Sequence, residues 1–130
     1  IKNIKVFDSI PSDKKFDIII CTVKLYDFDN FILDLKNVGI NNSIILPFQN
    51  GIYSEQKVIE EFGKTNAFGA VAQISSYVDE NQIIKHNGKL ATFFVGHMFN
   101  KEDDRLNDFC NKCKNSGLDL RLKQNIKEKI

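Results

Sequence analysis

Hydrophobic residues in the first half of the chain alternate between short continuous runs and helical repeats. The runs at 18–23 (IIICTV) and 44–46 (IIL) are typical of parallel strands that are covered on both faces. Residues 28–38 carry Phe, Ile, Leu and Val at helical spacing, and residues 54–62 repeat this pattern over a shorter length. The order strand, helix, strand, helix predicts an α/β fold with parallel strands and crossover helices.

Polar and special residues mark where these elements begin and end. Asp27 and Ser54 stand before the two helical repeats and are expected to cap them, while Gly39 and Gly63 are expected to stop them. Pro47 is expected to end the second strand because it has no backbone N–H for a ladder. Residues 1–10 predict one further short strand, which leads into a loop.

The pattern changes after residue 66, where short apolar segments follow one another with turns between them. Turn chemistry occurs at Asp79-Glu80-Asn81 and at Asn87-Gly88. The expected strands cover residues 66–72, 74–78, 82–86 and 91–96. The second half is therefore predicted to add antiparallel strands, then a helix over 103–116 stopped by Gly117, and an edge strand over 118–122.

Composition and charge narrow the class of protein. The 130 residues are 42% hydrophobic and 27% charged, which is typical of one globular domain or part of one. A net charge of +1 with scattered charges does not suggest nucleic acid or an acidic membrane as partner. No apolar run approaches the ~20 residues of a spanning helix, and no signal peptide is recognised. Because the first residue is Ile, we expect a piece of a longer protein.

Three cysteines, an odd number, favour a reducing compartment over a disulfide framework, so we expect a cytoplasmic protein. Cys110-x-x-Cys113 permits a redox or zinc hypothesis, but a zinc site needs about four ligands and no second pair exists. Both cysteines fall on the apolar face of the predicted helix, which favours core packing. His86 and His97 have no partners at ligand or triad spacing. We therefore predict no metal site.

The seven glycines do not form G-x-G-x-x-G or a P-loop, so the phosphate-binding turn of a dinucleotide fold is absent from this chain. The most informative positions are Lys24 and Asn50, one polar residue after each of the two buried strands. Ligands bind where neighbouring parallel strands end, so a cation and an amide there predict an anion or carbonyl site. Either residue alone is more typical of a solvated strand end or a turn.

The segments DIIICTVK (17–24), SIILPFQNG (43–51), FGAVAQISS (68–76) and NGKLATFFVG (87–96, expected as a hairpin) resemble the ketopantoate reductase (2-dehydropantoate 2-reductase) family. The resemblance covers nearly the whole chain but only the middle of a family member. It implies that residues 1–130 are an incomplete NAD(P)-binding Rossmann-like domain, which lacks the N-terminal glycine-rich unit and the C-terminal helical domain.

The resemblance also implies an activity and its residues. Lys24 and Asn50 would contact NADPH and the 2-keto acid, and Ser75 would lie near a backbone contact to the cofactor. The family's general-acid lysine would fall beyond Ile130, so no catalytic residue is expected within the chain and the piece alone is expected to be inactive. The alternatives are a related NAD(P)-dependent dehydrogenase of another 2-keto or hydroxy acid, and a non-catalytic module that assembles through an exposed sheet edge as a homo-oligomer.

Overall fold

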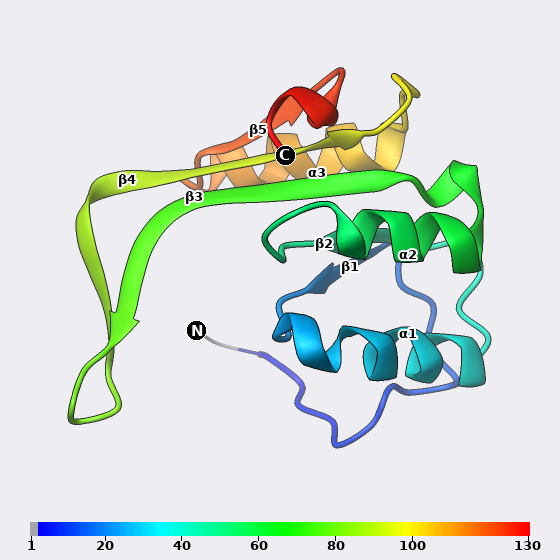
Figure 1. Ribbon diagram of the computed structural model, residues 1–130, viewed down its shortest axis with the longest axis horizontal. Coiled ribbons are helices and arrows are strands. Elements are labelled where there is room, and N and C mark those ends of the chain that lie inside the picture. The colour runs from blue at the N-terminus through cyan, green and yellow to red at the C-terminus, as the bar shows by residue number, and fades with distance from the viewer. Residues whose placement is uncertain (1–2) are drawn as a thin grey trace.

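The computed structural model describes residues 3–130 and shows an α/β fold that begins with a parallel strand–helix–strand unit (Figure 1). β1 (Ile18–Cys21) and β2 (Ile44–Pro47) pair in parallel, with Ile18 opposite Ile44 and Cys21 opposite Pro47. The helix α1 (Phe28–Asn37) connects them, and α2 (Tyr53–Phe62) follows β2. The predicted parallel α/β unit is therefore confirmed.

Strand β2 forms the centre of the hydrophobic core because helices cover both of its faces. Ile45 packs with buried residues of α1 and α2 on one face. Ile44 and Leu46 pack on the other face, in a cluster that includes Leu106 and Cys110 of α3 (Asp104–Asn115). This two-sided burial is the reason that the strand reads as an uninterrupted aliphatic run in the sequence.

The second half of the chain forms a three-stranded sheet. β3 (Phe68–Val78) pairs antiparallel with β4 (Ile84–His97), and β5 (Leu120–Lys123) pairs parallel with β4 as an edge strand. β3 contacts β2, so this sheet adjoins the parallel pair. The predicted addition of antiparallel strands is confirmed.

Two long strands replace the four short ones expected between residues 66 and 96. The hairpin turn lies only at Asp79, whose carboxylate accepts the backbone N–H groups of Asn81 and Ile83. The expected hairpin at Asn87-Gly88 is wrong, because these residues form an irregularity inside β4, where Ile74 pairs with Ala91 but Ser76 with His86. A positive φ of 80° at Gly88 serves such a bulge as well as a turn, so local chemistry alone did not distinguish them.

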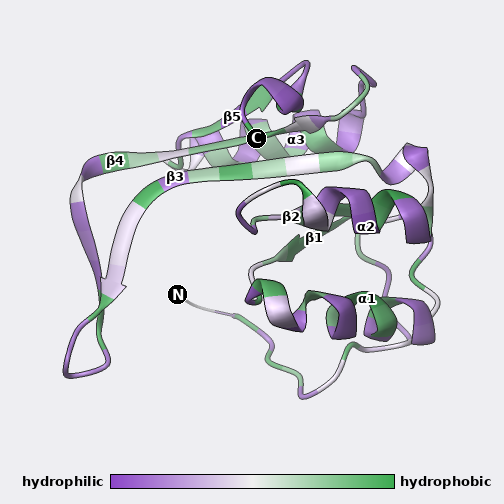
Figure 2. Ribbon diagram, in the orientation of Figure 1, coloured by the Kyte–Doolittle hydropathy of each residue, from purple (hydrophilic) through white to green (hydrophobic). Residues whose placement is uncertain are grey.

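The outer halves of β3 and β4 form an arm that bends away from the rest of the molecule (Figure 1). Both faces of the arm are exposed, including the apolar side chains of Tyr77, Val78 and Ile84. Figure 2 shows hydrophilic residues at its tip, whereas β1 and β2 are hydrophobic. A two-stranded ribbon without a covering layer contributes little stability by itself.

Three further predictions at element ends are wrong. Residues 3–10 form no strand; Ile4 and Val6 are exposed, and no neighbouring strand pairs with them. Asp27 occupies the N-cap position of α1 but makes no side-chain cap, since a 3₁₀ turn at Leu25–Asp27 leads into the helix. Ser54 does not cap α2, because the helix begins at Tyr53 and Ser54 is its second residue. The Ser54 side chain is buried.

The last helix and the last strand lie close to their predicted positions. α3 spans Asp104–Asn115, and Asp103 caps it by accepting the N–H of Arg105. Short 3₁₀ segments occur at Lys64–Asn66 and Ile126–Glu128, the second capped by the side chain of Asn125. Over residues 3–130, no helix combines the length and apolar character needed to cross a bilayer.

Candidate functional site

The two parallel strands bring the loops that follow them to the same edge of the sheet. Cys21 and Pro47, the last residues of β1 and β2, are register partners. Lys24 and Asn50 each come three residues after these positions, and both are exposed. The structure therefore places the two predicted ligand-contacting residues beyond neighbouring strand ends, as the strand order predicted.

Hydrogen bonds tie the two loops together beyond the last ladder pair. The backbone N–H of Phe48 donates to the carbonyl oxygen of Cys21 at 3.0 Å. The side-chain amide Nε2 of Gln49 donates to the carbonyl oxygen of Val23 at 2.8 Å and lies 3.3 Å from that of Cys21. The loop of Lys24 is thus fixed against the loop of Asn50 by groups next to both residues.

Asn50 borders a small cavity of about 80 Å³ between the β2 loop and strand β3. Its lining comes from Phe48–Gly51, Ala70–Ala72, Lys129 and Ile130. At this volume it has room for two or three water-sized groups, or for one polar group of a ligand, rather than for a whole ring. The small side chains of Ala70 and Ala72 form the β3 side of this cavity.

Lys24 and Ser75 lie outside this cavity. Lys24 precedes the 3₁₀ turn, and its carbonyl oxygen accepts the N–H of Asp27 at 2.9 Å. Ser75 is exposed on the arm, at the irregularity where the β3–β4 register shifts between Ile74 and Ser76. The structure therefore brings Lys24 and Asn50 to one edge and puts Ser75 farther along β3. The ligand contacts of all three residues stay predictions.

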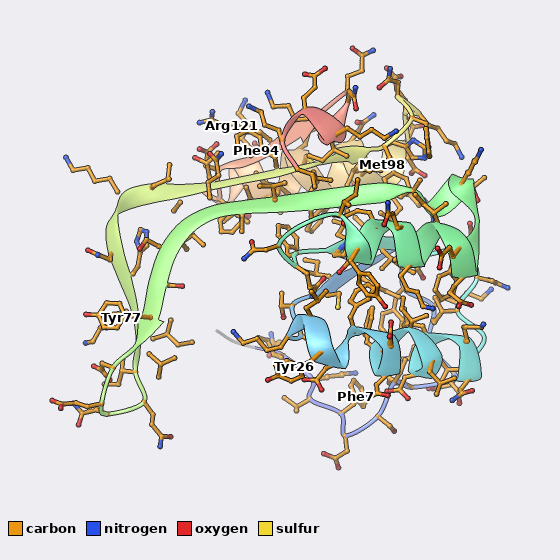
Figure 3. The ribbon with its side chains drawn as sticks, in the orientation of Figure 1. Phe7, Tyr26, Tyr77, Phe94, Met98 and Arg121 are labelled. Atoms are coloured by element: carbon orange, nitrogen blue, oxygen red, sulfur yellow. The ribbon has the colours of Figure 1, made fainter. Side chains whose placement is uncertain are left out.

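Sequence reasoning missed the cross-loop role of Gln49 and underestimated the place of Lys129. Gln49 directly precedes Asn50, and this adjacency was the available signal. Lys129, for which the sequence predicted no role, lies beside the Asn50 cavity. Its Nζ lies 5.1 Å from the centre of the Phe94 ring, a cation–π contact. Figure 3 shows Phe94 and Arg121 at the top of the view, above β3.

Glu55 in the first turn of α2 is fully buried, which nothing in the sequence indicated. Burial raises the pKa of its carboxyl group to about 7, because a charged carboxylate loses its hydration there. The nearby backbone amides of Glu55 and Ala70 oppose this rise without reaching hydrogen-bond geometry. The neutral acid is therefore the favoured form in slightly acidic solution.

Cys110 and Cys113 pack in the core around α3, which confirms the core interpretation of this pair. Burial raises the pKa of the Cys110 thiol to about 11, so little reactive thiolate forms. His97 at the end of β4 is buried, and its Nδ1 accepts the N–H of Phe99 at 3.0 Å. Within residues 3–130, no three His, Cys, Asp or Glu side chains are grouped to hold a metal ion.

Comparison with known families bears directly on this fold. The sequence pattern of the family described as ketopantoate reductase PanE/ApbA matches residues 1–99. The chain belongs to this family. The match covers both strand outlets and the whole of the β3–β4 hairpin.

Two curated proteins are similar to the chain. A 2-dehydropantoate 2-reductase of Pyrococcus horikoshii is 26% identical over 124 residues, which cover 95% of the chain and 40% of that protein. An uncharacterized oxidoreductase, YkpB, of Bacillus subtilis is 27% identical over 92 residues, which cover 71% of the chain and 30% of that protein. The chain thus spans less than half the length of either relative.

Solved structures share the fold. A 2-dehydropantoate 2-reductase from Geobacter metallireducens superposes with a TM-score of 0.72 at 20% identity, over 86% of the chain and 37% of that protein. A D-mandelate dehydrogenase, solved with NADH and anilino(oxo)acetate, superposes with a TM-score of 0.67 at 16% identity, over 88% of the chain and 36% of that protein. The predicted Rossmann-like fold is confirmed by these matches.

Proposed function

We propose that residues 1–130 are an incomplete Rossmann-like domain of an NADPH-dependent reductase that converts 2-dehydropantoate to pantoate, a step of pantothenate biosynthesis. The observation that carries this proposal is the placement of Lys24 and Asn50 past the ends of neighbouring parallel strands in a chain of this family. That edge is where ligands of open α/β sheets bind. The three cysteines are free thiols, in keeping with a cytoplasmic protein.

The residues at this edge fit the nicotinamide end of the cofactor. Asn50 offers an amide that both donates and accepts, and the cavity beside it takes one polar group rather than a ring. Ser75 lies farther along β3, at an irregularity of the ladder where a backbone group is available for a contact. The pyrophosphate end needs a glycine turn that is not in this sequence, so this chain holds only part of a cofactor site.

The proposed chemistry is reduction of a keto carbon. The nicotinamide cofactor, when bound, supplies the hydride. Asn50 orients the cofactor and the keto acid by hydrogen bonds, and the Lys24 ammonium attracts the substrate's negative charge. The proton for the developing alkoxide comes from a lysine that we place beyond Ile130. The 130 residues alone are therefore inactive.

A second candidate is the reduction or oxidation of a different 2-keto or hydroxy acid. The observation that favours it is the similar TM-score of the D-mandelate dehydrogenase, whose structure contains a 2-keto acid analogue with NADH. One scaffold serves several substrates, because pocket residues rather than the sheet select them. NADH in place of NADPH belongs to this second candidate.

A third candidate is a non-catalytic module that assembles with a second copy of itself. The arm leaves Tyr77, Val78 and Ile84 exposed, and its strand edges carry free backbone groups. In this case the oligomeric state, rather than a ligand, would be the property to measure. Sedimentation at several concentrations of the chain distinguishes a monomer from such an assembly.

The deciding experiment expresses the complete reading frame that contains this chain and follows the absorbance of the reduced cofactor. Each of NADPH and NADH is paired with 2-dehydropantoate and with benzoylformate, and the 130-residue chain is assayed in parallel. We expect turnover with NADPH and 2-dehydropantoate only in the complete protein. Preference for benzoylformate would favour the second candidate. Turnover by the 130-residue chain would refute the proposal that this chain holds only part of the catalytic site.

A further inference from the structure

The side chain of Gln49 spans the gap between the two loops that carry Lys24 and Asn50. Gln49 directly precedes Asn50 in the β2 loop, and its Nε2 donates to the carbonyl oxygen of Val23, which directly precedes Lys24, at 2.8 Å. The same nitrogen lies 3.3 Å from the carbonyl oxygen of Cys21. One amide group therefore joins the residues next to both predicted ligand contacts.

This connection begins where the sheet itself ends. The Cys21 carbonyl already accepts the backbone N–H of Phe48, which is the last backbone hydrogen bond between the two segments. The loop of residues 22–24 extends past that point, and all three residues are exposed. Beyond the ladder, the Gln49 amide hydrogen-bonds this exposed loop to its neighbour.

We propose that Gln49 is a positioning residue, which sets the distance and orientation between Lys24 and Asn50 before a ligand arrives. This inference rests on the proposed function, because it gives that pair a purpose in binding a nicotinamide and a keto acid. Two loops held in the bound arrangement lose less conformational entropy on binding than two free loops. Gln49 itself need not touch the ligand to have this effect.

The chemistry of the contact requires a hydrogen-bond donor at this position. The acceptors are the backbone carbonyl oxygens of Val23 and Cys21 and, at 3.5 Å, the Sγ of Cys21, so the donating half of the amide makes the connection. Its Oε1 is buried without a partner among residues 3–130. Methionine has a similar length but no donor, and an ionised glutamate sets oxygen against oxygen. Histidine retains a ring N–H that can donate. The variants Q49M and Q49E should therefore release the loop, and Q49H should retain it.

The test uses the 130-residue chain labelled with ¹⁵N and measures backbone order parameters for residues 22–24 by NMR. Q49M and Q49E should lower the order of these residues, whereas Q49H should not. Q56M is the matched control, because Gln56 is an exposed glutamine on α2, outside both loops. Thermal unfolding of each variant identifies a general loss of folding, and the order of residues 22–24 is compared only among folded variants. Unchanged order in folded Q49M would overturn the proposal.

Binding is then followed by titration with nicotinamide mononucleotide, a probe that carries no adenosine and needs no glycine turn. In wild type the amide signals of Lys24 and Asn50 should shift together; in Q49M the apparent Kd should rise about tenfold, with recovery in Q49H. Equal affinity of wild type and Q49M would refute the positioning role. If wild type shows no shift at all, the nicotinamide site fails, and the loop order still decides whether Gln49 connects the loops.

Discussion

Gly96 in β4 lies directly against the backbone carbonyl of its register partner Lys123 in β5. A side-chain methyl group at Gly96 would overlap the carbonyl oxygen and carbon of Lys123, and these atoms belong to the sheet backbone. The approach of β5 to β4 at this register position therefore requires a residue without a Cβ. β5 leads into Ile126 and Lys129, so this close approach also sets where the last residues meet the Asn50 cavity.

We expect G96A to destabilise the protein by about 1–3 kcal/mol, because the backbone of β5 must move away. G69A is the comparison variant: its new methyl group would lie 2.9 Å from Cδ1 of Ile130, 3.1 Å from Cγ2 of Ile126 and 3.3 Å from Sδ of Met98. These are side-chain atoms rather than sheet backbone, so G69A should cost less than G96A. Urea unfolding of both variants provides the comparison. Equal losses of stability would contradict the close β4–β5 approach.

Glu55 should make the stability of the protein fall between mildly acidic and neutral pH. Its pKa is about 7 in the folded state against an ordinary value of 4.5, so the folded state binds this proton more tightly than the unfolded chain. The stabilisation is fully present below pH 4.5 and is lost as the pH rises through 7, up to about 3 kcal/mol.

E55Q keeps the size of the side chain and removes the titration, so its unfolding free energy should vary less than that of wild type between pH 4.5 and 7. E60Q, on the exposed part of the same helix, should keep the wild-type slope. Chemical unfolding at several pH values measures both slopes. A wild-type slope in E55Q would show that another group titrates.

Asp103 should stabilise the start of α3 through two kinds of contact. Its carboxylate accepts the backbone N–H of Arg105 at 3.0 Å and pairs with the guanidinium at 2.8 Å. D103A should cost about 1–2 kcal/mol, because the helix loses its cap as well as the ion pair. D103N keeps a cap acceptor and should lose less, and D104A should lose least. A D103N as unstable as D103A would assign the effect to the ion pair.

The same contacts give Asp103 a pH dependence of opposite sign to that of Glu55. The hydrogen bonds from Arg105 hold the pKa of Asp103 below 3.8 in the folded state. Its stabilisation is therefore present above pH 3.8 and is lost as the pH falls further. The difference in unfolding free energy between wild type and D103N should shrink in strong acid.

Under the proposed function, N50A in the complete protein should lower kcat/KM by about a hundredfold, because the proposed orienting hydrogen bond from Asn50 is lost. K24M should act mainly on KM for the keto acid, since it removes an attractive charge. S75A should change neither constant by more than about twofold, as the expected contact there uses the backbone rather than the hydroxyl. Steady-state assays at varied cofactor and substrate concentrations separate the three. A large effect of S75A would indicate that the hydroxyl group of Ser75, rather than its backbone, makes the contact.

Cys110 should react slowly with iodoacetamide at pH 8, because burial raises the pKa of its thiol to about 11 and leaves little thiolate. Denaturation should restore the reactivity of an ordinary thiol. Mass spectrometry of peptides from folded and unfolded protein gives the ratio. Fast modification of the folded protein would return the Cys110-x-x-Cys113 pair to a redox hypothesis.

The sequence by itself determined the parallel α/β unit, the helix after residue 103 and the places of Lys24 and Asn50. Strands that are buried on both faces are apolar throughout, and helices with one buried face carry apolar residues every three to four positions. These elements can therefore be predicted from the local sequence pattern. The order of the elements then allows few topologies, and parallel strands end at one edge. For this reason two residues 26 positions apart were predicted to meet at the same edge.

Only the tertiary structure decided how the second half pairs and which polar groups are buried. Asn87-Gly88 suits a turn or a bulge equally well, and the long-range β3–β4 register chose the bulge. Glu55 carries the same local preference for a helix as an exposed glutamate, and the packing of α2 buried it. The Gln49 contact joins segments 26 residues apart. Such contacts depend on the distances between elements, and these distances cannot be predicted from the spacing of residues within one element.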